Sequence, residues 1–193
     1  MEYNSKIYLS PKYQKSDYSE LNLSITSPEE DWKKAIEIFT DRMDGRFLNQ
    51  IRALLSDVSA NGFAIMALDC LLIETFLQFE IGKSQTPQFN SEQYSAFLMR
   101  AFPSAFKNIN AAKRFYIDIR CGILHSAQTK GHSRLTSDES YIIYYDGDLL
   151  SVSVTKFSLL LVSYFEAYKS KLMDSNETNL RNNFLKKMAS VCR

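Results

Sequence analysis

The chain has 193 residues, of which 45% are hydrophobic and 23% are charged, as is ordinary for one soluble globular domain. Its 23 basic and 22 acidic residues give a net charge of +1, which excludes a general positive field for nucleic acid. Any such binding must come from a local patch.

The cysteine content and the distribution of apolar residues predict where the protein works. Three cysteines without close pairing, at Cys70, Cys121 and Cys192, are typical of a reducing cytoplasm and indicate no disulfide framework. The first ten residues lack the apolar run of a signal peptide, and no stretch approaches ~18 uninterrupted apolar residues. We therefore expect a cytoplasmic protein that neither is secreted nor spans a membrane.

Residues 1–26 are predicted to form an extended N-terminal arm, followed by a single helical domain over residues 27–193. Tyr3, Tyr8, Tyr13 and Tyr18 recur every five residues, a period that matches neither a helix face nor a strand face. These rings are either anchors of an arm that packs along the domain or a partner, or parts of a loosely held leader.

The first half of the domain is predicted to be helical. Ser27 and Pro28 signal a helix start, and Asp44-Gly45 predicts a break before a second amphipathic piece. Asn61-Gly62 opens a segment, ending near Gly82, that is apolar nearly all round and is typical of a central core helix. Asp69 and Glu74 interrupt it. A buried carboxylate needs a partner, for which Arg120 is a candidate with Glu74, unless both acids reach solvent at the helix edge.

The second half combines further helices with one hairpin. Residues 85–88 are predicted as a loop, Ser91 or a neighbour as the start of a short helix that Pro103 ends, and Asn108 or Asn110 as a helix cap. Alternation over 141–145 and 150–154 around Asp146-Gly147 predicts a hairpin, to which Leu135 adds a third short strand. Helices follow from about Thr155 and over 176–191. The fold class is therefore mainly all-α, with a small β-hairpin insertion near residues 134–154.

Arg120 and His125 are the candidate catalytic residues. They lie on a predicted apolar helix with Gly122 between them, and a glycine inside a helix costs about 1 kcal/mol relative to alanine. Gly122 thus indicates a helix end or a close approach to its backbone. Residues five apart lie about 140° apart on an ideal helix. The two side chains converge only if the helix distorts at Gly122, if a cleft admits both, or if a two-fold dimer brings two copies together.

The segment Arg120-Cys-Gly-Ile-Leu-His125, late in a helical chain, resembles the Arg-x4-6-His signature of the HEPN superfamily. The resemblance covers roughly residues 28–175. It implies a helical bundle that dimerises and acts as a metal-independent endoribonuclease in prokaryotic toxin–antitoxin or antiviral systems. Cys121 stands where that family often has asparagine or aspartate, and the hairpin is an elaboration of its minimal bundle.

The resemblance also implies the chemistry. The 2′-hydroxyl of RNA attacks the adjacent phosphorus, His125 acts as general acid or base, and Arg120 pairs with the non-bridging oxygens. Cys121, Gly122 and Glu74 support the site. Five further residues either hold flanking phosphates or form a solvated surface: Lys113, Arg114, Lys130, His132 and Arg134. No metal or cofactor is required, and the expected partners are RNA, a second copy of the chain and, in a toxin–antitoxin system, an antitoxin.

Other interpretations of the same residues stay open. Cys121, His125 and His132 have a spacing compatible with zinc, although no nearby Cys or His supplies a fourth ligand. Cys121 with His125 could act as a nucleophile and its base, although a helix-interior cysteine is more typical of a core position. If His125 is only structural, the chain is a non-catalytic helical module that binds nucleic acid or a protein through the arm or the hairpin.

Overall fold

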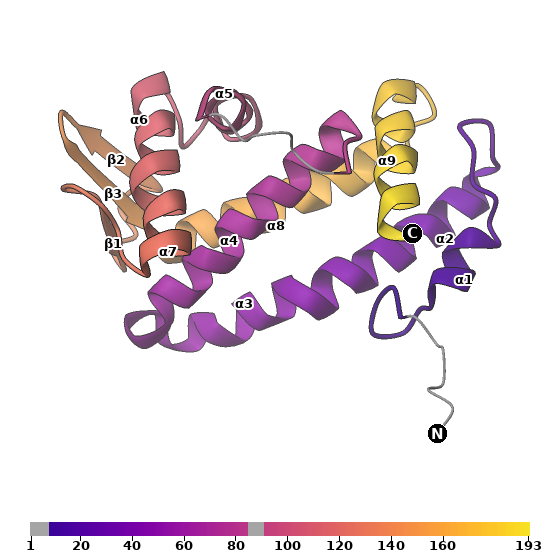
Figure 1. Cartoon of the computed structure of the whole chain (residues 1–193), viewed down its shortest axis with the longest axis horizontal. Helices are drawn as coiled ribbons and strands as arrows, with labels where there is room; N and C mark the ends of the chain where they lie inside the picture. Colours follow the sequence, from indigo (N-terminus) through magenta and orange to yellow (C-terminus); the bar gives the residue numbers. More distant parts are fainter. Residues whose placement is uncertain (1–7, 85–90) are drawn as a thin grey trace. The chain divides into compact units, whose positions relative to one another are not determined.

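The structure of the protein is a computed structural model that describes residues 8–84 and 91–193. The described part is mainly helical with a small three-stranded sheet, which confirms the predicted fold class at this level (Figure 1). Tyr3 and the predicted loop over residues 85–88 lie outside the described residues. The elements, in chain order, are α1 (Lys15–Ser19), α2 (Glu29–Met43), η1 (Asp44–Leu48), α3 (Asn49–Leu54), η2 (Leu55–Asp57), α4 (Val58–Ile81), α5 (Ser91–Ala101), α6 (Ile109–Arg114), η3 (Phe115–Arg120), α7 (Cys121–Ser126), β1 (Arg134–Thr136), β2 (Ile143–Asp146), β3 (Leu149–Ser153), α8 (Val154–Met173) and α9 (Thr178–Val191).

The chain forms two compact units that are discontinuous in sequence, so the boundary expected at residue 26 does not separate them. Unit 1 comprises Met1–Gln50, Gln78–Gln85 and Glu166–Arg193, and unit 2 comprises Ile51–Leu77 and Thr86–Phe165. Helices α3, α4 and α8 contribute residues to both units because a unit boundary falls inside each of them.

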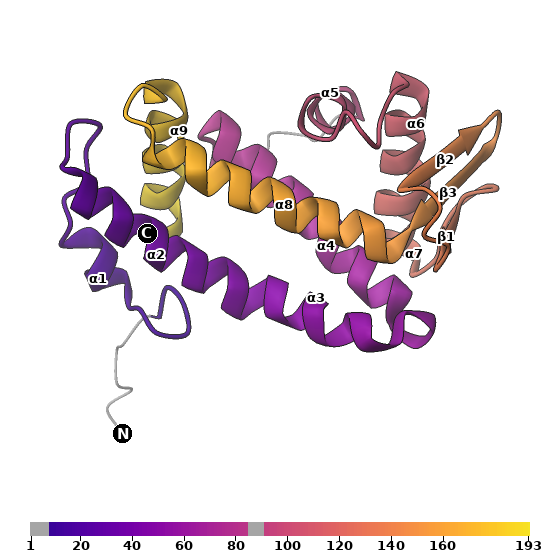
Figure 2. The same ribbon diagram turned by 180° about the vertical axis from the view of Figure 1, so that it is seen from behind.

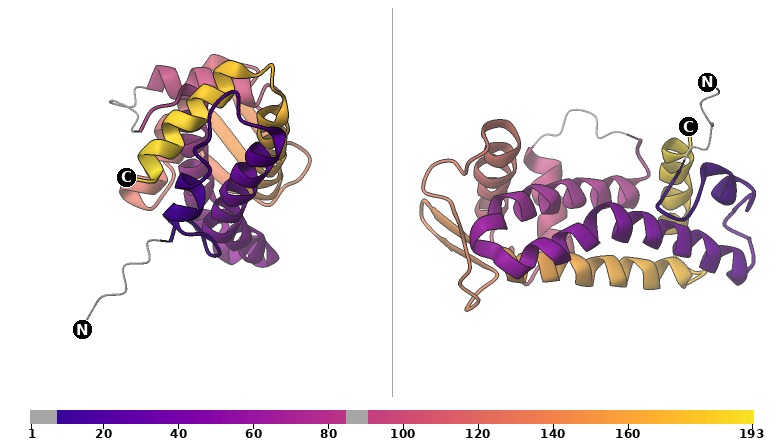
Figure 3. Two further views of the ribbon diagram at one scale, coloured as in Figure 1. Left: turned by 90° about the vertical axis from the view of Figure 1, so that its right-hand side faces the viewer. Right: turned by 90° about the horizontal axis from the view of Figure 1, so that it is seen from below.

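Unit 1 has an aromatic core between α2 and α9, which lie close together in Figure 1 and in the left view of Figure 3. The Phe39 ring lies 4.5 Å from that of Phe79 and 5.3 Å from that of Phe184. Trp32 is fully buried, and the Arg181 guanidinium lies 4.3 Å from its ring centroid. The predicted apolar stripe of α9 therefore supplies this core, and Arg181 is buried with it rather than beside it.

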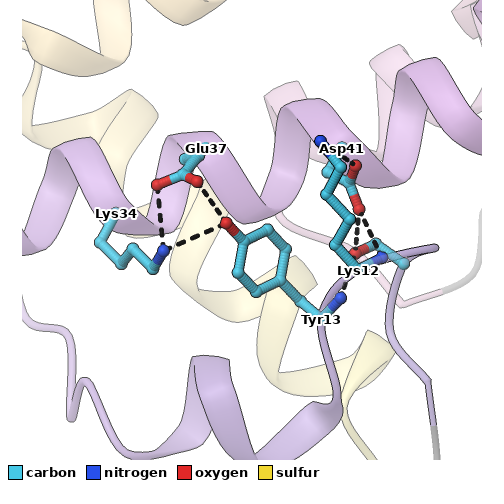
Figure 4. A network of polar contacts seen from close by, with 6 residues as sticks. Lys12, Tyr13, Lys34, Glu37 and Asp41 are labelled. Carbon is cyan, nitrogen blue, oxygen red and sulfur yellow. Dashed lines mark hydrogen bonds and ion pairs between the residues drawn. The ribbon is translucent and has the colours of Figure 1, made fainter.

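The N-terminal arm of unit 1 is docked rather than extended. It contains helix α1, and Tyr18 is buried. Figure 4 shows the polar contacts: the Asp41 carboxylate accepts from the Lys12 backbone N–H at 2.9 Å, and the Tyr13 hydroxyl bonds to Glu37 while accepting from Lys34 at 3.1 Å. Over residues 8–26 the arm thus contains one short helix, and these contacts hold it against α2. Tyr13 and Tyr18 act as anchors.

The predicted break at Asp44-Gly45 is also wrong. The helix continues through the π-helical turn η1, and a Cβ added at Gly45 would lie 2.2 Å from Cγ of Pro11. Gly45 is therefore explained by the close approach of the arm, not by a helix end. Likewise Asn61-Gly62 lies inside α4, which starts at Val58.

Unit 2 packs the first part of α4 against α8, and Figure 2 shows α8 running beside α4; α5 packs against α6. The Phe76 ring of α4 stacks on Phe165 of α8 at 5.9 Å, and Phe115 lies 5.0 Å from Phe157. Asp69 is fully buried between the same helices and accepts a 2.6 Å bond from the Ser158 hydroxyl. Asp69 does not reach solvent, contrary to the open alternative from the sequence, because α8 covers that side of α4.

The sheet of unit 2 confirms the predicted hairpin. Strand β3 is central, with β2 antiparallel on one side and β1 parallel on the other. Asp146 pairs with Leu149, so the two turn residues are Gly147 and Asp148, one position later than predicted, and Gly147 supplies the positive φ of 54°. The sheet lies beside α6 and α7 (Figure 1).

One apolar segment meets the length and composition of a membrane span. Within the helical run Glu29–Ile81, an 18-residue window has a mean hydropathy of 1.6, and 56% of it is buried inside the structure. A core helix of a soluble protein has the same composition. In α4, the burial of Ile65, Met66, Leu72 and Ile73 agrees with the predicted core helix.

Candidate functional site

The site is built on one continuous helix that comprises α6, η3 and α7. Asn108 caps its start, as predicted, because its side-chain oxygen accepts from the Asn110 N–H at 2.8 Å. Phe115, Ile119 and Ile123 face the core. In η3 the hydrogen bonds span five residues, as in the bond from the Cys121 N–H to the Tyr116 carbonyl. Arg120 is the last residue of this wide turn.

Arg120 is the centre of a polar cluster within unit 2. Its Nη2 donates to Oε2 of Glu74 at 3.0 Å, and its Nη1 lies 3.3 Å from Nε2 of His125. Nη1 also lies 3.8 Å from Sγ of Cys121, and the guanidinium lies 5.7 Å from the Tyr116 ring centroid. The predicted partnership of Glu74 with Arg120 is thus present, and so is the convergence of Arg120 with His125.

The convergence has a different origin from the one the sequence suggested. Gly122 is inside the α-helical turn α7, and the helical distortion is the π-helical turn before Arg120. A long arginine side chain that leaves a widened turn reaches an imidazole five residues ahead. Both residues belong to one chain, so their contact does not require a second subunit.

The charge of Arg120 is well supported. Burial disfavours the cation, but the bonds to Glu74 and Cys121 outweigh this and raise the pKa of Arg120. The side chain of Arg120 is 15% exposed and that of Glu74 is 26% exposed. Nε of Arg120 is buried and has no hydrogen-bond partner in the described part of the chain. The guanidinium is therefore held from the protein side while Nη1 stays near the surface.

His125 is exposed, and the geometry defines its hydrogen-bonding role. A guanidinium nitrogen can only donate, so Nε2 of His125 is the acceptor. With Nε2 as the acceptor, this ring nitrogen carries no proton in the contact. An unprotonated imidazole nitrogen that is open to solvent can accept a proton from a ligand.

Gly122 allows the chain to fold back on the site helix. After α7, Ala127 adopts a left-handed conformation with φ of 53°, and the Lys130 N–H donates to the Asp118 carbonyl at 3.0 Å. A Cβ added at Gly122 would lie 2.5 Å from the Gln128 carbonyl oxygen. The predicted close approach to Gly122 is confirmed, and the approaching group is the backbone of Gln128 and Lys130.

The five predicted phosphate-binding residues differ in their contacts. Arg114 is paired with Asp118 at 3.5 Å and with Asp148 at 2.8 Å. Nε of Arg134 donates to the Ser151 hydroxyl at 3.3 Å. The other three are exposed: Lys113, Lys130 and His132. Two of the five are thus engaged in structural contacts.

Two features of the site were not identified from the sequence. Tyr116 lies under the Arg120 guanidinium, and its spacing of four from Arg120 was an available signal. Asp118 is buried and accepts a 2.6 Å bond from the Ser133 hydroxyl. This bond ties the turn after α7 to the site helix, and only the tertiary structure brings Ser133 to it.

The zinc interpretation is not supported by the geometry. Within residues 8–84 and 91–193, no group of three or more His, Cys, Asp or Glu side chains is close enough to hold a metal ion. Cys121, His125 and His132 are therefore not gathered into a common site.

Comparison with known proteins finds no relative of this chain. No family model, no curated protein and no solved structure matches the chain. The function is therefore inferred from the residues of the site.

Proposed function

We propose that this protein is a metal-independent endoribonuclease of HEPN type, with Arg120 and His125 as its catalytic residues. The observation that carries the proposal is the 3.3 Å contact between the charged guanidinium and an exposed, proton-accepting imidazole. A fixed cation beside a base at the surface is the combination that phosphodiester cleavage needs without a metal.

The reaction is a transesterification within RNA. A phosphate oxygen binds Nη1 of Arg120, replaces the contact with His125 and frees Nε2. The imidazole then takes the 2′-hydroxyl proton while the 2′-oxygen forms a bond to phosphorus. The bond from phosphorus to the 5′-oxygen breaks, and this oxygen takes a proton from solvent. The products are a 2′,3′-cyclic phosphate and a 5′-hydroxyl, and Arg120 stabilises the charge on the non-bridging oxygens.

Glu74 is the positioning residue of this mechanism. It binds Nη2 of Arg120 at 3.0 Å and leaves Nη1 for the phosphate. An arginine has five N–H donors in a planar fork, so one edge can be anchored while another binds the substrate. Cys121 and Gly122 support the site through the Sγ contact and the close packing of the returning chain.

The setting of the enzyme is part of the same proposal. The HEPN resemblance supports a cytoplasmic protein in a toxin–antitoxin or phage-defence system, with RNA as substrate, an antitoxin as a further partner and a homodimer as the active form. Leu124, which lies one turn after Arg120 on the same helix, is 41% exposed, as befits a side chain that a second copy covers.

The test is RNA cleavage by the purified full-length protein in EDTA. The wild type should cut and leave 2′,3′-cyclic phosphate ends, and His125→Ala and Arg120→Ala should each lower the rate by at least ~100-fold. Lys186→Ala is the control, because this side chain is exposed on α9 of unit 1, outside the Arg120 cluster, and it should keep most of the rate. Circular dichroism checks that each variant is folded. Absence of cutting by the wild type, or equal losses in His125→Ala and Lys186→Ala, would contradict the proposal.

A second candidate function is a non-catalytic helical module that binds a partner protein or nucleic acid. It is favoured by the large apolar side chains that unit 2 exposes: Phe63, Leu71, Ile109, Ile117, Leu124 and Leu159. Under this hypothesis, wild type and His125→Ala behave alike towards RNA.

A further inference from the structure

A pocket in unit 2 lies next to the site helix and is not used by the proposed mechanism. Its volume is ≈ 370 Å³, and it is lined by Asn110, Lys113, Arg114, Ile117, Asp118 and Tyr145. The first five belong to the site helix, and Tyr145 belongs to β2. We call it the Tyr145 pocket.

The pocket lies on the helix that carries the catalytic pair, about two turns before His125. Lys113, Ile117, Cys121 and His125 follow one another at intervals of four residues, so that each lies about one turn after the one before it. At 1.5 Å per residue, Ile117 is about 12 Å from His125 along the helix axis. The nucleotides next to a phosphate bound at Arg120 can span that distance.

The walls of the pocket suit a planar ring. Residues alternate in exposure along β2, so that Tyr145 is half-buried and lines the pocket while its neighbour Tyr144 is 44% exposed. Ile117, on the helix side, is 50% exposed. An aromatic ring on one side and an aliphatic side chain on the other can hold a nucleobase between them, because every base has a π-face that stacks on aromatic side chains.

The charge of the pocket favours a base over a chain of phosphates. The Arg114 cation is already paired with Asp118 and Asp148. Lys113 is exposed and has no ion-pair partner in the part of the chain that the structure describes, so it can contact one phosphate. The Asn110 side chain is exposed at the rim and offers both a donor and an acceptor to a base edge.

We propose that the Tyr145 pocket binds an unstacked nucleobase of single-stranded RNA, next to the phosphate that Arg120 and His125 cleave. Bases in a duplex are stacked on their neighbours and cannot enter such a pocket. The pocket therefore selects single-stranded segments. This inference rests on the proposed ribonuclease function for its ligand, but its binding step can be measured separately from cleavage.

The experiment uses full-length His125→Ala protein, so that the RNA stays intact, and measures fluorescence anisotropy with a labelled unstructured RNA and with a duplex of the same sequence. Addition of Tyr145→Ala should weaken binding of the single strand about tenfold, since stacking on the ring is lost. Tyr145→Phe should restore it. Tyr144→Ala is the matched control from the same strand and should leave affinity unchanged. The duplex should bind more weakly and be insensitive to Tyr145→Ala.

Three outcomes overturn the inference: unchanged single-strand affinity in Tyr145→Ala, an equal loss in Tyr144→Ala, or equal affinity for the duplex. If Tyr145→Ala does not fold, Ile117→Ala takes its place in the test, since shortening an exposed side chain leaves the helix intact. Ile117→Ala should weaken binding of the single strand several-fold, and unchanged affinity refutes the pocket. If the wild type cuts RNA and Tyr145→Ala leaves the KM unchanged, the pocket proposal is wrong and the ribonuclease function stands. If RNA binds through Tyr145 but the wild type does not cut it, only the ribonuclease function is wrong.

Discussion

Asp69 provides the most specific prediction, because no charged group among the described residues of unit 2 compensates this buried carboxyl. It is fully buried, and its Oδ2 accepts the Ser158 hydroxyl at 2.6 Å. Its Oδ1 is buried and has no partner among the described residues. Burial raises the pKa of Asp69 to about 8, with the Ser158 bond acting in the opposite direction. The folded protein therefore carries this carboxyl in its neutral form at pH 7.

The sign of the resulting pH dependence follows from this shift. The pKa of aspartate is near ~4 in the unfolded chain. Below that pH the Asp69 carboxyl is protonated in both the folded and the unfolded state, so its ionisation does not lower the free energy of unfolding. Between about pH 4 and pH 8 only the unfolded state releases the proton, so the free energy of unfolding falls as the pH rises. At about 1.36 kcal/mol per pKa unit, the loss is at most about 5 kcal/mol.

Asp69→Asn tests this reasoning. Asparagine keeps an acceptor for Ser158 and stays neutral at every pH, so the variant lacks this part of the pH dependence. Urea denaturation from pH 5 to pH 8.5 should show the stability of Asp69→Asn rising relative to wild type by at least ~2 kcal/mol. Asp57→Asn is the control, because bonds from Ser59 and Ala60 lower the pKa of Asp57 and place its titration below this range. A difference between wild type and Asp69→Asn that stays constant with pH would refute the reasoning.

The other predictions concern the site helix and its anchor. Gly122→Ala should destabilise the protein by about 1–3 kcal/mol in thermal denaturation, because the new Cβ would lie 2.5 Å from the Gln128 carbonyl. The free-energy cost of this clash exceeds the gain of about 1 kcal/mol in helix propensity. Gly62→Ala, whose Cβ would meet only Cγ2 of Val154 at 3.7 Å, should instead stabilise by up to ~1 kcal/mol, and equal effects of the two would be contrary to this explanation. Glu74→Gln should cost about 1–2 kcal/mol in urea denaturation and lower RNA cleavage about tenfold, since Arg120 loses its charged anchor; an unchanged cleavage rate would show that Glu74 does not position it.

Local patterns in the sequence were sufficient for most helices and for the sheet. The Asn108 cap, the start of α5 at Ser91 and the strand alternation around Gly147 each depend on hydrogen bonds and periodicity within a few residues. Arg120 and His125 could be selected in the same way, because their residue types and spacing are local. Their contact could not, since ideal helix geometry separates them.

The sequence by itself thus determined the mainly helical fold class, the three-stranded sheet and the two side chains of the candidate site. Only the tertiary structure decided the π-helical turns, the burial of Asp69 and the pairing of Glu74 with Arg120. The physical reason is the separation along the sequence of the residues that interact. Helix and strand patterns repeat over a few residues, whereas Glu74 and Arg120 are 46 residues apart, and Asp69 and Ser158 are 89 apart. Such pairs form only when packing of distant segments removes water from between them.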